Sequence, residues 1–226
     1  MENNLLLLLQ LCNSSLPLGA YSYSEGLEFW VENGDINDAQ TLRQWLENEL
    51  IYGSIRLEGA IALRAYNCYL NGDSERLYYW NNWLSASRET KELREQSWQM
   101  GKSFCRLILS LIPDESKLHS VINNFDSPCN GAIAFGIITA HSGISPQQML
   151  WGYLHNWLNN IVNGGVKLIP LGQTEGQKLI LNLHSTIISS SEQIMNLQDE
   201  QLASCSWGLS FASIHHETLY SRLFRS

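Results

Sequence analysis

The sequence is poor in charge, and most of the charge that it has is negative. Only 16% of its 226 residues are Asp, Glu, Lys or Arg, 44% are apolar, and the formal net charge is −8. No run of basic residues occurs, which argues against nucleic acid or an anionic membrane as the ligand. So little charge is unusual for a soluble surface. Either a partner covers part of the surface, or the chain buries a large core.

Patterns typical of secreted and membrane proteins are also missing. No CxxC pair occurs, and the five cysteines stand singly, at Cys12, Cys68, Cys105, Cys129 and Cys205. This suits a reducing cytoplasm better than a disulfide framework. The apolar run in MENNLLLLLQLC is shorter than the roughly 20 residues of a membrane span. Glu2 precedes it where a signal peptide carries Lys or Arg. We therefore expect a cytoplasmic protein, no membrane contact and a buried first helix.

Motifs of catalysis and of cofactor binding are incomplete. Residues 101–103 (GKS) end like a phosphate-binding loop, but Gln96 stands where its first glycine belongs. Residues 22–26 (SYSEG) lack the first glycine of a nucleophile elbow, and no strand precedes them. We expect Ser24 to cap a helix through Leu27 instead. The six histidines show neither HxxxH nor HExxH spacing. The sequence therefore predicts no catalytic residues, no metal ligands and no intrinsic cofactor.

Apolar residues recur with the period of an α-helix along most of the chain. Leu42, Leu46 and Leu50 form one stripe, and similar stripes occur within 100–111, 150–161 and 180–187. Sustained two-residue alternation is absent. The pattern predicts an all-α fold of roughly ten helices, with almost no sheet, in one compact domain over residues 1–226.

Several helix ends can also be assigned. Asp38 is a candidate cap for a helix that begins near Ala39, and Ser145 precedes a proline at a first helical position. Helices are expected to stop at Gly72, at Pro113 and at the pair 164–165, which is Gly-Gly.

The end of the chain differs in kind from the rest. The segment HHETLYSRLFRS (215–226) is polar and mildly basic, with apolar residues interleaved. On a helix, Leu219, Leu223 and Phe224 would share one face, suited to a groove in a partner. Such a segment is either frayed or docked onto something.

Three segments together resemble the urease accessory protein UreF family. They are SLPLGAYSYSEGLE (15–28), VKLIPLGQTEGQ (166–177) and HHETLYSRLFRS (215–226), and the resemblance covers essentially the whole chain. It implies an all-α fold that forms a homodimer and catalyses no reaction itself. It further implies that the chain binds UreD, called UreH in some species, recruits the GTPase UreG, and docks with them on apo-urease. Nickel and GTP would act through these partners.

The resemblance also implies roles for individual residues. Tyr21, Glu28 and Lys167 match positions on a UreG-facing surface, and Gln173 and Gln177 match a central loop near the dimer axis. Residues 206–226 match a tail that becomes ordered on binding UreD. Its matched residues are His216, Glu217, Tyr220, Arg222, Leu223 and Phe224.

The chain departs from the family pattern at several positions, among them the one after Gly19, which is often another small residue before an aromatic. Glu25 stands where His or Gln is common, and His215 stands where Arg is common. These departures concern the fine-tuning of partner binding.

Two other functions stay open. A helical metal carrier would use His215 and His216, shared across a dimer. An unrecognised all-α enzyme would use Cys129, His141 or Ser24, and it predicts a deep pocket with at least two titratable groups of perturbed pKa.

Overall fold

The computed structural model describes residues 2–19, 22–203, 207–216 and 223–224, and its regular elements are all helical. The elements are α1 (Glu2–Leu11), α2 (Leu27–Glu32), α3 (Ala39–Tyr52), α4 (Ser54–Asn71), α5 (Ser74–Ser87), α6 (Lys91–Leu111), α7 (Ser116–Asn123), α8 (Gly131–His141), α9 (Pro146–Leu168), α10 (Gln173–Asn182), α11 (His184–Asn196), the 3₁₀ turn η2 (Asp199–Gln201) and α12 (Trp207–His216). No strand occurs in these ranges. The predicted all-α class is confirmed for them.

Helix α8 lies at the centre of the fold. Every residue from Ala132 to Ala140 is buried, because the sequence AIAFGIITA is apolar on all sides. Its closest neighbour is α4, and the two backbones nearly touch at Gly136. A Cβ added there would lie 2.3 Å from the carbonyl oxygen of Ala62. Small residues on both helices therefore set the distance between them.

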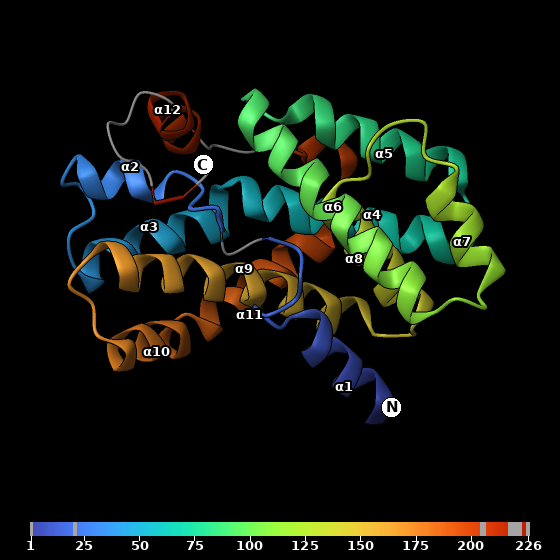
Figure 1. Ribbon diagram of the computed structural model, residues 1–226, viewed down its shortest axis with the longest axis horizontal. Coiled ribbons are helices and arrows are strands. Elements are labelled where there is room, and N and C mark those ends of the chain that lie inside the picture. The colour runs from blue at the N-terminus through green and yellow to red at the C-terminus, as the bar shows by residue number, and fades with distance from the viewer. Residues whose placement is uncertain (1, 20–21, 204–206, 217–222, 225–226) are drawn as a thin grey trace.

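The other helices surround this pair (Figure 1). Helices α5, α6 and α7 gather at one end of the molecule, and α2, α10 and α12 lie at the other. Helix α9 packs against both α4 and α11. The described C-terminal residues lie beside α2, far from the N-terminus on α1.

Most helix ends follow the sequence signals. The Asp38 carboxylate accepts a hydrogen bond from the Thr41 backbone N–H at 2.8 Å, and the Ser145 hydroxyl accepts one from Gln148 at 3.3 Å. Gly72 ends α4 in the left-handed conformation, with φ of 70°. Helix α6 ends at Leu111, before the proline.

The glycine pair Gly164–Gly165 does not end a helix, which corrects the sequence-based prediction. Helix α9 continues through both residues to Leu168. A Cβ added at Gly165 would lie 2.7 Å from Cδ2 of Leu42 on α3. The glycine allows α3 and α9 to approach, and this packing outweighs its poor helix propensity.

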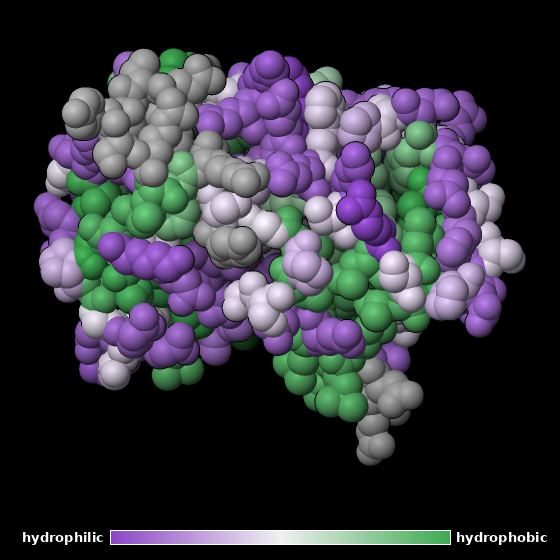
Figure 2. Space-filling view, in the orientation of Figure 1, coloured by the Kyte–Doolittle hydropathy of each residue, from purple (hydrophilic) through white to green (hydrophobic). Residues whose placement is uncertain are grey.

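The first helix is only half buried, which corrects a second prediction. Leu8 and Leu11 are buried, and Leu8 packs with Cys12 against Gly152 of α9. Leu5, Leu6 and Leu9 are exposed, and Leu7 is partly buried. Figure 2 shows a largely hydrophobic surface on the projecting helix. Among the described residues, no helix combines the length and the apolar character of a membrane span.

Candidate functional site

Glu28, in the first turn of α2, holds the C-terminal segment with its carboxylate. Oε1 accepts a hydrogen bond from the backbone N–H of Leu223 at 2.6 Å, and Oε2 accepts one from Phe224 at 3.2 Å. Hydrogen bonds to a charged acceptor are stronger than neutral ones. The side chain is buried, with 6% of Glu28 exposed. The chain's own C-terminal segment thus covers a carboxylate that was expected on a partner-facing surface.

Lys167 and Phe224 meet at the same place. The Phe224 ring is buried against Gly164 of α9, and the Lys167 ammonium lies 5.7 Å from the centre of the ring. The side chain of Leu223 points the other way, and the residue is 63% exposed. We call Glu28, Lys167, Leu223 and Phe224 the tail corner. It unites residues from all three sequence segments that carry the family resemblance.

Helix α12 brings the chain to this corner by packing on α2. Phe211 makes an edge contact with Phe29, stacks on Trp30 and lies 4.3 Å from His215, measured between ring centres. Gly26, with φ of 82°, provides the close approach, since a Cβ there would lie 2.7 Å from Cβ of Ala212.

The start of α2 corrects the expectation for Ser24. The N-cap residue is Gly26, and Ser24 lies two positions earlier. Its hydroxyl still accepts a hydrogen bond from the Glu28 backbone N–H, at 3.5 Å. Ser24 is buried and serves the helix start from outside the cap position.

The remaining candidate residues divide into two groups. Gln173 and Gln177 are exposed on α10, and Gln173 lines the same shallow hollow as Lys167. The others lie outside the described residues, as does the side chain of His216. They are Tyr21, Glu217, Tyr220 and Arg222.

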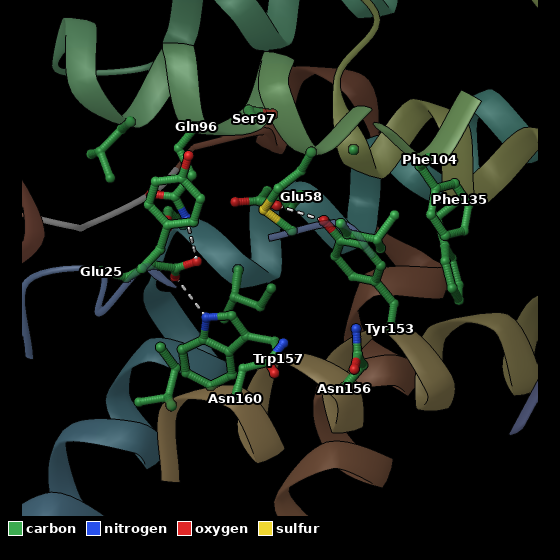
Figure 3. A pocket seen from close by; sticks show the side chains of 18 of the residues that line it. Glu25, Glu58, Gln96, Ser97, Phe104, Phe135, Tyr153, Asn156, Trp157 and Asn160 are labelled. Atoms are coloured by element: carbon green, nitrogen blue, oxygen red, sulfur yellow. Dashed lines mark hydrogen bonds between the residues drawn. The ribbon is translucent and has the colours of Figure 1, made fainter. Parts of the chain in front are cut away.

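A second polar site lies inside the molecule, between α4, α6, α9 and the loop before α2. Figure 3 shows Glu25, Gln96 and Trp157 pointing toward one another. The three residues line a cavity of about 70 Å³. Oε2 of Glu25 accepts from Nε1 of Trp157 at 2.7 Å, and Oε1 accepts from Nε2 of Gln96 at 3.0 Å. Glu25 has φ of 50°, the left-handed region that non-glycine residues rarely adopt. The carboxylate, bonded at both oxygens, thus anchors a strained turn.

An ion pair lies beside Glu25 in the same cavity. Arg88 contacts Glu58 at 2.5 Å, and the hydroxyl of Tyr153 donates to the other oxygen of Glu58 at 2.5 Å. Burial disfavours the charge of Arg88, but the Glu58 carboxylate outweighs this and raises the pKa of Arg88. Burial and the negative charge of Glu58 raise the pKa of Tyr153. Arg88 therefore stays charged and Tyr153 stays neutral.

Two carboxyl groups in this region titrate near neutrality. Burial, followed by the charge of Glu58, raises the pKa of Glu25 to about 7. Burial, followed by the charge of Glu25, raises the pKa of Glu49 to about 7. One arginine balances only one of the nearby carboxylates, so protonating the others relieves the excess negative charge.

The buried cluster was missed by motif reasoning, although the sequence contains a signal for it. Glu49 lies at helical spacing from Leu42 and Leu46, on the apolar face of α3. Glu58 likewise lies three residues from both Ile55 and Ile61, on the apolar face of α4. A charge on an apolar stripe predicts a buried partner.

The residues of the enzyme alternative do not line this cavity. His141 hydrogen-bonds to Tyr69 at 2.9 Å, and Cys129 is buried beside Cys105. The hydrogen bond with Cys105 and burial raise the pKa of Cys129, which makes its thiolate scarce. Within the described ranges, no group of three or more His, Cys, Asp or Glu could hold a metal ion.

Comparison with known proteins gives consistent matches, and those to individual relatives cover the whole chain. The family model UreF matches residues 36–184. The urease accessory protein UreF of Nostoc sp. strain PCC 7120 is 55% identical over 225 residues, covering 100% of this chain and 97% of the relative. The protein of that name from Trichormus variabilis is 53% identical with the same coverage. That of Thermosynechococcus vestitus is 43% identical over 226 residues, covering 100% of the chain and 99% of the relative.

Proposed function

Because the chain belongs to the UreF family of urease accessory proteins, we propose that it is a non-catalytic adaptor in urease maturation. It binds UreD, recruits the GTPase UreG, and brings both to apo-urease in the cytoplasm. Nickel and GTP act through these partners. The observation that carries the proposal is the full-length match to relatives named urease accessory protein UreF.

The outer face of the C-terminal segment supports a protein partner. Phe211 and Ile214 of α12 and Leu223 of the tail corner all expose large apolar side chains. Burying one such side chain in a partner contributes roughly 1.5–3 kcal/mol, less the entropy of ordering it. Beside them, Lys167 offers an exposed cation. Apolar anchors with a charge at the rim are typical of a specific interface.

A co-purification experiment tests the adaptor role. We expect the wild-type chain to be retained on immobilised UreD and then to retain UreG. Lys167→Ala should keep the UreD step and weaken retention of UreG roughly tenfold, because it removes a charge at the rim of the corner. Lys178→Ala is the matched control, since its ammonium is exposed on α10 and pairs with Glu175.

Two results would count against the adaptor role. Failure of the wild-type chain to bind UreD would remove it altogether. Equal losses in Lys167→Ala and Lys178→Ala would remove the role given to the tail corner.

The adaptor is proposed to work as a homodimer, with Gln173 and Gln177 near the axis. Replacing both by Glu would then bring four carboxylates together across the axis, and we expect the dimer to shift toward monomer. Sedimentation velocity at micromolar concentration measures this. Gln193→Glu, an exposed position on α11, is the control and should leave the dimer intact. A dimer unchanged by the double replacement would place the interface elsewhere.

The cavity beside Glu25 is the observation that favours the enzyme alternative. It holds a carboxyl group with a pKa of about 7, as a general base requires. Its volume of about 70 Å³, however, has room for only a few water molecules. A substrate larger than this volume would have to displace the side chains that line the cavity. The adaptor function requires no such rearrangement.

A further inference from the structure

The Glu28 carboxylate is occupied within the chain. Both of its oxygens accept backbone N–H groups of the C-terminal segment, and the residue is 6% exposed. A partner protein that docks on the formed tail corner therefore reaches Leu223 and Lys167 but not this carboxylate. Any effect of Glu28 on such a partner has to pass through the residues that it holds.

We infer that Glu28 is a positioning residue, which builds the GTPase-binding surface by fixing the orientation of Leu223 and Phe224. The inference rests on the proposed function and says how Glu28 contributes to recruitment of the GTPase. The surface that the GTPase contacts is then the outer face of the tail corner, formed by the side chain of Leu223 and the ammonium of Lys167. The resemblance assigns Leu223 to the tail that binds UreD, and the inference gives it a second role because it lies beside Glu28 and Lys167.

The backbone geometry explains how one carboxylate selects this arrangement. Successive N–H groups of an extended strand point to opposite sides, so two adjacent ones converge on a single acceptor only where the backbone bends. The chain does bend at Leu223 and Phe224. The bend turns the Phe224 ring into its seat against Gly164 and leaves Leu223 facing outward. The two hydrogen bonds to the carboxylate favour this bend over an extended chain.

Lys167 completes the surface from the side of α9. Its ammonium lies 5.7 Å from the centre of the Phe224 ring, so the seated ring and the cation are positioned together. An apolar side chain beside a cation fits a pocket of the GTPase that has an apolar floor and an acidic residue at its rim.

The first experiment measures the placement of the tail without any partner. In Glu28→Gln the side-chain amide keeps the volume but offers one acceptor, and its N–H₂ faces a second donor. Hydrogen exchange of the Leu223 and Phe224 amides should become roughly tenfold faster or more. Glu32→Gln, exposed on the same helix, should leave both rates unchanged. Unchanged exchange in Glu28→Gln would overturn the inference.

The second experiment is a double-mutant cycle on retention of UreG by the complex with UreD. Glu28→Gln and Phe224→Ala should each weaken retention of UreG roughly tenfold. The double variant should retain as much UreG as the single variant with the larger loss, because both changes disturb the same contact. Phe224→Leu, which refills part of the seat, should restore some retention. If retention of UreG by the double variant falls about a hundredfold, the two single effects multiply and Glu28 contacts the GTPase directly. That result would overturn the inference but not the proposed function. A wild-type chain that retains no UreG would instead overturn the proposed function.

Discussion

Glu25→Gln is expected to raise the free energy of unfolding at pH 8 by about 3 kcal/mol. The folded state raises the pKa of Glu25 from 4.5 to about 7, so the folded chain binds this proton more tightly than the unfolded chain does. The contribution of protonated Glu25 to the free energy of unfolding is fully present below pH 4.5 and is lost as the pH rises through about 7. Above that pH, the wild-type chain carries a buried, ionised carboxylate. Glutamine keeps the shape and stays neutral. Its oxygen can still accept from Trp157, and the Gln96 amide can turn to present its own oxygen to the new N–H₂ group.

Urea denaturation at pH 5 and at pH 8 checks this prediction. At pH 5 the gain should be small, because Glu25 is already protonated in the folded chain. Glu49 titrates in the same range, so the variant that carries both Glu25→Gln and Glu49→Gln should show the flattest pH profile. Glu32→Gln, exposed on α2, should follow the wild type. No gain at pH 8 would mean that water or another group already compensates the charge of Glu25.

Gly136→Ala is expected to destabilise the fold by about 3 kcal/mol or more. The added Cβ would lie 2.3 Å from the carbonyl oxygen of Ala62 and 3.1 Å from Cβ of Ala65. Neither atom can move without shifting the backbone of α4, so the two central helices have to separate. The lost packing then extends along the core of the molecule.

A matched substitution in the same helix separates this effect from helix propensity. A Cβ added at Gly131 would lie 3.6 Å from its nearest neighbour, which is ordinary contact. Gly131→Ala should therefore leave the midpoint of thermal unfolding unchanged or raise it slightly. Equal losses in the two variants would contradict the close approach of α4 and α8.

The helices were predictable because their signals are local. Leu42, Leu46 and Leu50 are fully buried along α3, as their spacing predicts. The errors occurred where packing overrides a local signal. Gly164–Gly165 resembles a helix stop in sequence, but the close approach of α3 keeps the helix intact.

The two sites depend on contacts that no local pattern encodes. Glu25 meets Gln96 and Trp157 across 71 and 132 residues of sequence. Family resemblance identified Glu28 and Lys167 as belonging to one surface. It did not indicate that the carboxylate of Glu28 would be covered by the chain itself, because that depends on where α12 docks.

The contact between Glu28 and Leu223 has a consequence for protein synthesis. The two residues are 195 positions apart, so Leu223 leaves the ribosome long after α2 has been made. Contacts of such separation close late in folding, since the intervening chain has to be ordered first. A nascent or truncated chain that lacks Leu223 can form the central helices but not the tail corner. Recruitment through that corner would thus select finished molecules and leave incomplete ones out of metallocentre assembly.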